Sequence, residues 1–260
     1  MIKKDIYSVL TKIYTDKYFR RLIFLNKLDL KKEFGLSDEE SQVIQTLSPE
    51  KIEGFGNSIV YKLLMIIENE ISDLSQIHSN LFAELEYFMT IQSRAPQTSL
   101  ISYTLSFLEY LYQIIPDTEK KEFLDFEINA LSCKIASSSV PFWEAKMPPK
   151  FKKNLFLKQH PLLRVGLYSS NNRYLKKRFS TLSSSSNKDV HILFFSSSKN
   201  TICSISSYLV ALISMCDGTY TYSDLVKQIN EGLGSYSRET KKAFDWLLQN
   251  GYILYAENAK

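Results

Sequence analysis

Five acidic residues in helix-forming segments are the side chains of this sequence best suited to binding a metal ion. They are Glu84, Glu86, Glu109, Asp125 and Glu127. A di-iron centre in a helical bundle combines such carboxylates with a Glu-x-x-His motif from each of two helices. The chain contains no Glu-x-x-His sequence, and its three histidines are spread widely along it. The pattern therefore predicts no metal site in this chain.

Other catalytic motifs are also missing. Glycine-rich phosphate loops, a nucleophile elbow and a His-Glu-x-x-His segment are absent, and eight glycines in 260 residues leave little material for them. Cys133, Cys203 and Cys216 lie in apolar segments without the close pairing of a zinc or redox motif, so we expect small buried side chains. The sequence predicts a protein that is not an enzyme.

The composition places the chain among ordinary globular proteins. It is 44% hydrophobic and 23% charged over 260 residues, which is long enough for two domains. No apolar run approaches the roughly 20 residues that a membrane helix needs. The start, from Met1 to Asp5, lacks the apolar stretch and cleavage site of a signal peptide. We therefore expect a cytoplasmic protein without a membrane segment.

The first half of the chain has apolar residues at helical spacing almost throughout. Ser37 followed by Glu40 has the pattern of a capping box, and Pro49 after Ser48 suits the first position of a helix. Further predicted helices span residues 2–15, 17–26, 49–72, 74–91, 99–115 and 118–136. Together they predict a helical bundle domain over residues 1–137.

Two of these helices carry apolar stripes that we expect to face the core of the bundle. In helix 49–72 the stripe consists of Ile52, Phe55, Ile59, Leu63, Ile66 and Ile67. In helix 99–115 it consists of Leu100, Tyr103, Leu105, Phe107, Leu108, Leu111 and Tyr112. Side chains at this spacing form a core more often than a cofactor site.

A strongly basic segment follows the predicted bundle. Between residues 138 and 190 there are eleven Lys and Arg residues against two acidic ones, whereas the whole chain carries a net charge of +4. Aromatic residues interleave with these charges, so the segment is either a nucleic-acid or phosphate surface or a solvated linker. Residues 138–160 are predicted to be a basic connector. The run from Ser183 to Ser186 predicts a flexible loop.

The C-terminal part, residues 161–260, is predicted to be a domain that combines a short antiparallel sheet with helices. Residues 189–196 form an extended apolar segment, and residues 163–168 are a candidate partner strand. Apolar residues recur at helical spacing in residues 205–215, 223–233 and 238–249. The pair Asp217-Gly218 is typical of a turn. This order is typical of a winged-helix-like unit. The predicted fold class is mainly α with a smaller α+β part.

Several local patterns resemble one family in the same order along the chain. The segment from Phe107 to Leu111, then Pro116 and Phe123 to Ala130, resembles the rhythm F-L-x-Y-L … P … L-A-x-x-E-x-A of the MbnC-like companion proteins of multinuclear iron TIM-barrel oxidases. Residues 16–30, 34–40 and 47–52 are similar to the N-terminal helical region of proteins from peptide-modification gene clusters. Residues 189–196, 212–218 and 244–254 are similar to the peptide-recognition winged helix of these companions.

This resemblance implies a concrete function. The companion forms a heterodimer with the iron-dependent TIM-barrel oxidase and binds the leader of a ribosomal precursor peptide, so that a cysteine of the core peptide reaches the partner's iron. The chain itself would then hold no cofactor. An extended leader suits this function by adding as a strand to an exposed sheet edge, where main-chain hydrogen bonds provide affinity.

The edge and groove that would bind the peptide can be assigned to residues. We expect the edge to be the strand that contains Val190, Ile192, Leu193, Phe194 and Phe195. Across the groove, the last helix would provide an apolar wall of Phe244, Leu247 and Leu248. Because successive side chains of a strand point to opposite faces, only one alternating set of the strand would contact the peptide. The alternative is that these side chains, with Trp246, form the core of a small domain.

Two other functions stay open at the level of sequence. A nucleic-acid-binding winged-helix regulator needs a recognition helix with basic and amide residues on one face. Both candidate helices, residues 223–233 and 238–249, carry basic and acidic residues in similar number, so nucleic acid is the less favoured partner. A helical scaffold or interaction protein would use the N-terminal half as its working surface.

Overall fold

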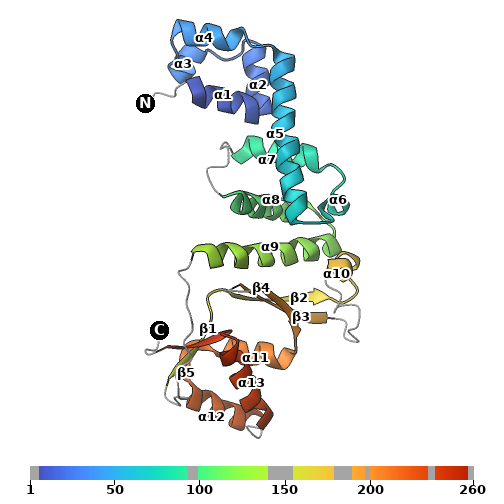
Figure 1. The fold of residues 1–260 in the computed structure, drawn as a ribbon, viewed down its shortest axis with the longest axis vertical. Coiled ribbons are helices and arrows are strands. Elements are labelled where there is room, and N and C mark those ends of the chain that lie inside the picture. Colours follow the sequence, from blue (N-terminus) through green and yellow to red (C-terminus); the bar gives the residue numbers. More distant parts are fainter. Residues whose placement is uncertain are drawn as a thin grey trace. The chain divides into compact units, whose positions relative to one another are not determined.

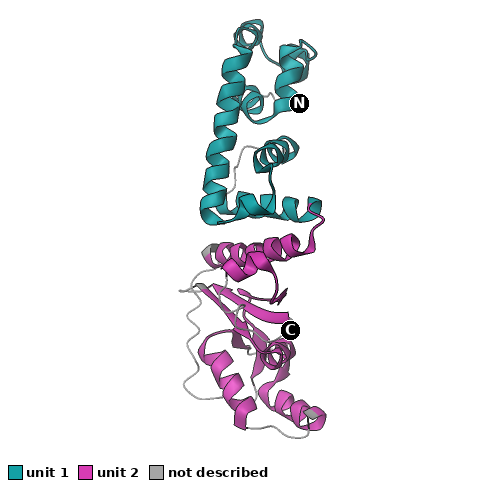
Figure 2. Ribbon diagram, turned by 90° about the vertical axis from the view of Figure 1, so that its right-hand side faces the viewer, with its two compact units in different colours: residues 1–114 teal, residues 115–260 magenta. Residues whose placement is uncertain are grey.

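The computed structural model describes residues 6–92, 99–139, 155–178, 189–196, 200–233 and 238–256. The chain divides into two compact units, unit 1 (Met1–Ile114) and unit 2 (Ile115–Lys260), coloured teal and magenta in Figure 2. Its described residues are mainly helical, with small antiparallel sheets (Figure 1), which confirms the predicted fold class at this level. None of the described helices combines the length and the apolar character needed to cross a membrane.

Unit 1 consists of helices in its described residues. They are α1 (Ile6–Thr15), α2 (Lys17–Phe24), α3 (Leu30–Phe34), α4 (Asp38–Gln45), α5 (Pro49–Glu70), α6 (Leu74–Ile77), α7 (Leu81–Gln92) and α8 (Leu100–Ile114). The predicted capping box is confirmed at α4. Ser37 Oγ accepts a hydrogen bond from the Glu40 N–H at 3.1 Å, and Glu40 Oε2 accepts one from the Ser37 N–H at 2.7 Å. Pro49 begins α5, as predicted.

The buried face of α5 differs from the predicted stripe. The residues buried on it are Ile52, Gly56, Val60, Leu63 and Ile67. Phe55 and Ile66 are 53% and 39% exposed, so their predicted place in the core is wrong. The buried face is rotated because it includes Gly56. There the Arg20 guanidinium and the Tyr14 carbonyl occupy the space that a side chain at position 56 would need.

The predicted helix over residues 74–91 is two helices, the single turn α6 and the longer α7. Between them, His78 Nδ1 accepts a hydrogen bond from the Asn80 N–H at 3.2 Å. This local side-chain bond competes with continuation of the helix. The break brings His78 Nε2 within 3.9 Å of Glu84 on the first turn of α7.

In its described residues, unit 2 combines helices with two three-stranded sheets. Its elements are α9 (Thr118–Ser139), β1 (Phe156–Gln159), β2 (Leu163–Ser169), α10 (Arg173–Arg178), β3 (Asp189–Ser196), β4 (Asn200–Ile205), α11 (Ser207–Met215), β5 (Asp217–Thr221), α12 (Tyr222–Leu233), α13 (Arg238–Gln249) and β6 (Ile253–Ala256). The strand orders are β2-β3-β4 and β5-β1-β6, with antiparallel neighbours. The predicted pairing of residues 163–168 with the strand at 189–196 is confirmed. Gly218 has a φ of 91°, as a turn glycine requires, although it lies inside β5.

The β2-β3-β4 sheet packs against other elements on both faces. On one face lies α9 (Figure 1), whose Phe126 ring is 5.1 Å from the ring of Phe194 and 5.7 Å from that of Tyr168. On the other face, Leu193 and Phe195 belong to an apolar core that also contains residues of α11, α12 and α13. A strand that is buried on both faces needs apolar residues at successive positions, which explains the continuous apolar run of β3.

The division of the chain differs from the predicted domains. The sequence places the boundary after residue 137, whereas the compact units divide between Ile114 and Ile115. α9 belongs to unit 2 because it packs on β2 and β3. Residues 140–154 of the predicted connector, and the serine run 183–186, lie outside the described residues. The end of that connector is the strand β1.

Candidate functional site

The residues predicted to bind a peptide are all buried. They are Val190, Ile192, Leu193, Phe194, Phe195, Phe244, Leu247 and Leu248, and each is at most 9% exposed. The first five lie on β3, which pairs with β2 on one side and with β4 on the other. The prediction that this strand is an exposed edge is therefore wrong. A strand with a hydrogen-bonded neighbour on each side has no free edge for another strand.

The two alternating side-chain sets of β3 have different neighbours, and neither faces solvent. Ile192 and Phe194 lie on the α9 side of the sheet, where Phe194 contacts Phe126. Leu193 and Phe195 share a core with the three predicted residues of α13. The structure thus brings the predicted strand and helix residues together as a packed core, which is the alternative considered from the sequence.

β4 is a strand of this sheet with a free side. Among the described residues it pairs with β3 alone. Ile202 is 39% exposed, and Ser204 is also exposed. Ile202 lies opposite Phe194 and therefore on the α9 side of the sheet, while Thr201 and Cys203 lie on the other side. The unpaired N–H and C=O groups of an edge strand are a template for another strand.

β4 has no counterpart among the predicted strands. Its signal in the sequence is the extended pattern Thr-Ile-Cys-Ser-Ile at residues 201–205. This pattern begins a few residues after the predicted strand ends, a spacing typical of a β-hairpin. The segment is short, and its last residue, Ile205, also fits the helical spacing of the residues that follow.

Aromatic side chains lie beside β4 on the side of Thr201 and Cys203. Tyr252 lies near both Thr201 and Cys203. The Tyr252 ring lies 5.1 Å from the ring of Phe195 and 5.1 Å from that of Trp246, which is partly exposed. Burial, followed by the nearby Cys203, raises the pKa of Tyr252, so its hydroxyl stays protonated at neutral pH. Near this edge strand the rings of Phe195 and Tyr252 are buried, and that of Trp246 is partly exposed.

Asp125 and Glu127, which the sequence offers as metal ligands, bind neighbouring side chains of unit 2. Asp125 Oδ2 accepts hydrogen bonds from Tyr168 Oη at 2.8 Å and from Asn129 Nδ2 at 3.0 Å. Glu127 is buried and accepts a hydrogen bond from Arg178 Nε at 2.9 Å. Burial raises the pKa of Glu127, and the Arg178 charge opposes that shift. These contacts join α9 to β2 and α10.

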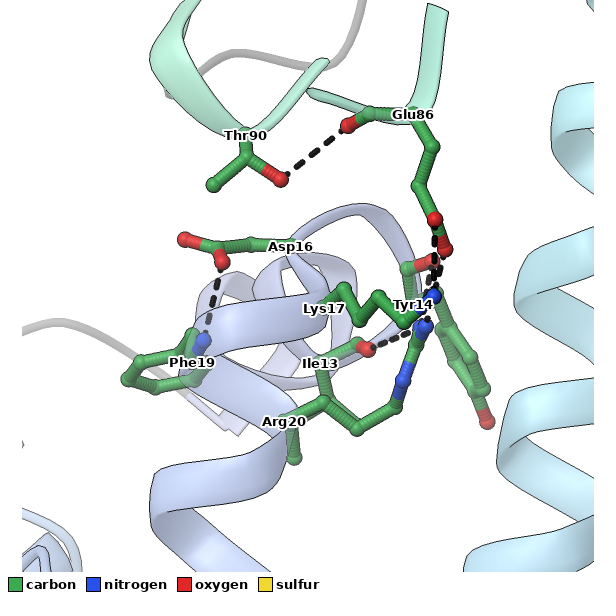
Figure 3. A network of polar contacts seen from close by, with 8 residues as sticks. All are labelled: Ile13, Tyr14, Asp16, Lys17, Phe19, Arg20, Glu86 and Thr90. Atoms are coloured by element: carbon green, nitrogen blue, oxygen red, sulfur yellow. Dashed lines mark hydrogen bonds and ion pairs between the residues drawn. The ribbon is translucent and has the colours of Figure 1, made fainter. Parts of the chain in front are cut away.

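Glu86 is the centre of a polar network in unit 1 (Figure 3). Lys17 Nζ lies 2.9 Å from Glu86 Oε2, and the Arg20 guanidinium lies 3.7 Å from Glu86 Oε1. The buried Arg20 also donates to the carbonyl oxygens of Ile13 at 3.1 Å and Tyr14 at 3.2 Å. Glu86 therefore joins α7 to α2, and Arg20 extends the network to α1.

The remaining candidates for chemistry are the metal-ligating and thiol side chains of the described residues. Within them, no group of three His, Cys, Asp or Glu side chains is arranged to hold a metal ion. Cys133 and Cys216 are buried as expected, whereas Cys203 is half-buried. Burial raises the pKa of all three thiols, which makes them poor nucleophiles at neutral pH.

The chain matches no known protein-family model, and no curated protein has a significantly similar sequence. The resemblance noted in the sequence therefore stays a hypothesis. Among the features described above, the free side of β4 has the clearest binding chemistry.

Proposed function

We propose that this chain is a non-catalytic partner subunit that binds the leader of a ribosomal precursor peptide and presents the core peptide to an iron-dependent TIM-barrel oxidase. The proposal extends the resemblance to the MbnC-like companion proteins. The observation that supports it most is an edge strand, β4, near the buried Tyr252 and the partly exposed Trp246. The iron would belong to the oxidase, and the chain would act in the cytoplasm as one half of a heterodimer.

The peptide is placed on β4 in this proposal, in contrast to the β3 site predicted from the sequence. An added strand pairs its main chain with a free sheet edge and sends alternate side chains to the two faces. One set would meet Ile202, and the other would meet Thr201 and Cys203. The opposite edge, β2, is less suitable because its Ser169 N–H already donates to Glu122 Oε2 of α9 at 3.4 Å.

The helices that follow β4 support a winged-helix-like interpretation of the C-terminal part. α11, β5, α12, α13 and β6 follow one another in the chain, and β1 lies between β5 and β6 in their sheet. The middle strand of this sheet, β1, thus precedes α11, α12 and α13 in the chain. In this interpretation, α13 packs its apolar face on the core behind β3, which leaves β4 and Trp246 for the peptide.

A helical interaction protein is the second candidate function. Its specific support is the apolar surface of α5, where Tyr61 and Met65 are one turn apart and 59% and 62% exposed. In the first proposal, the same surface of unit 1 is a candidate contact with the oxidase. DNA binding is less favoured, because Lys227 of α12 lies 3.9 Å from Glu231 and α13 mixes basic and acidic residues.

Co-expression with a TIM-barrel iron protein from the same gene neighbourhood tests the proposal. Size-exclusion chromatography with metal analysis should show one-to-one co-elution, with iron present only in the complex. Failure to associate, together with salt-sensitive retention of DNA, would overturn the proposal and favour a regulator. Association without any binding of precursor peptide would favour the interaction protein instead.

A further inference from the structure

Glu84 of α7 lies at the surface of unit 1 beside a tyrosine and a histidine. Its Oε2 accepts a hydrogen bond from Tyr110 Oη at 2.8 Å, and its Oε1 lies 3.9 Å from His78 Nε2. Because His78 Nδ1 already accepts from the Asn80 N–H, the neutral imidazole carries its proton on Nε2, towards Glu84. The Glu84 side chain is 26% exposed. It is therefore a partly buried carboxylate that solvent can still reach.

Two tyrosine rings flank this carboxylate. Tyr87 is three residues after Glu84 on α7, so the two side chains share a helix face. The Tyr87 ring lies 6.3 Å from that of Tyr110 at an angle of 46°, and Tyr87 is 58% exposed. Tyr110 is held in place by Phe88, whose ring lies 5.3 Å away. The surface therefore combines a negative charge with one exposed and one anchored aromatic ring.

The charge of Glu84 is weakly compensated within the described part of the chain, where His78 is the sole basic side chain within 4 Å of it. Glu86, two residues further along α7, has both Lys17 and Arg20 as partners. Burial and the neighbouring Glu84 carboxylate raise the pKa of Tyr110, so its hydroxyl remains a donor. A carboxylate in this setting can accept an additional cation.

We propose that Glu84, Tyr87 and Tyr110 form a binding site for an arginine side chain of a polypeptide partner. A guanidinium donates to carboxylates and stacks on aromatic faces, so a carboxylate beside two tyrosine rings suits its chemistry. The site lies in unit 1 and uses none of the residues near β4. It goes beyond the proposed function and stands independently of it.

The test uses the full chain with ring-labelled tyrosine and N-acetylarginine amide as the probe. Titration followed by NMR should shift the Tyr87 and Tyr110 signals saturably. The isosteric, uncharged N-acetylcitrulline amide should leave them in place. Glu84→Gln should weaken the arginine affinity by about fivefold, because it removes the charge while an amide oxygen can still accept from Tyr110.

Glu109→Gln is the matched control, because it removes a charge from an exposed position of α8 and should leave the affinity unchanged. Tyr87→Leu, at an exposed position, is a second variant that should weaken binding without unfolding unit 1. Three outcomes would overturn the site: equal shifts with the arginine and citrulline probes, no shift at all, or unchanged arginine affinity in both Glu84→Gln and Tyr87→Leu. Tighter binding of N-acetyllysine amide would overturn its assignment to arginine.

Discussion

The hydroxyl of Tyr168 on β2 donates a hydrogen bond to the Asp125 carboxylate on α9 at 2.8 Å. Asn129, one turn further along α9, donates to the same hydroxyl at 3.0 Å. The Tyr168 ring also packs against Phe126. Through this tyrosine, α9 is tied to the β2-β3-β4 sheet by both polar and apolar contacts, which accounts for its place in unit 2.

Gly166→Ala should destabilise unit 2, because an added Cβ would overlap the Tyr168 ring. Displacing that ring would also weaken its bond to Asp125. We expect a loss of about 1–3 kcal/mol in the free energy of unfolding, measured by urea denaturation. Gly232→Ala is the control in the same unit, since a Cβ there meets no atom within 4 Å. Equal stability of the two variants would contradict the packing described for Tyr168.

His160 should make unit 2 less stable in mild acid. It is buried, its Nδ1 accepts from the Leu162 N–H at 3.0 Å, and burial lowers its pKa from the usual 6.5. The unfolded chain therefore binds the proton more readily, so stability is complete above the unfolded pKa and falls as the pH drops below it. Unfolding curves at about pH 7.5 and about pH 5.5 should show the loss.

His160→Asn provides the comparison for this pH dependence. An asparagine side chain can still accept from the backbone two residues on, but it does not titrate. The variant should lose less stability than the wild type between the two pH values. The same loss in both proteins would assign the pH dependence to other groups.

Cys203 should react with a thiol reagent faster than Cys133 and Cys216. It is half-buried on an edge strand, whereas the other two are buried. Burial raises the pKa of Cys216 to about 12, so its reaction requires local unfolding as well as deprotonation. Mass spectrometry of peptides after timed labelling measures the three rates. Similar rates at all three positions would contradict the burial described for unit 2.

Arg20→Ala should destabilise unit 1 by about 3 kcal/mol, because it removes a buried cation from Glu86 and leaves two carbonyl oxygens without their donor. Arg21 is exposed on the same helix, and Arg21→Ala should change stability by less than about 0.5 kcal/mol. Thermal and urea unfolding of both variants measure the difference. A loss of the same size in the two variants would show that the network of Figure 3 contributes little.

Local signals in the sequence were sufficient for several elements. The Ser37 capping box, the start of α5 at Pro49 and the strand at residues 189–196 follow from side-chain chemistry close in sequence. The prediction of the buried face of α5 was wrong because Gly56 takes a buried position, and a glycine gives no apolar signal. Its place depends on Arg20, which is distant in sequence.

The candidate site was harder to predict because strand order is a tertiary property. The apolar run of β3 identifies a strand, yet whether it is central or at an edge depends on its neighbours, and β4 is short. The continuous run was itself a signal of burial on both faces. Residues such as Phe194 and Phe244 are therefore core residues, and among the described strands the edge of the sheet lies one strand further along the chain.

Hydrogen–deuterium exchange of the chain, with and without the precursor peptide of the same gene neighbourhood, tests the central claim most directly. Leader binding on β4 should slow exchange of the backbone amides of residues 200–205. Ile202→Asp should weaken peptide binding at least about tenfold, because a charge blocks strand addition at this edge. Leu167→Asp, at an exposed position of β2, should leave binding unchanged. Peptide binding without protection of β4, or equal binding by the two variants, would contradict the account.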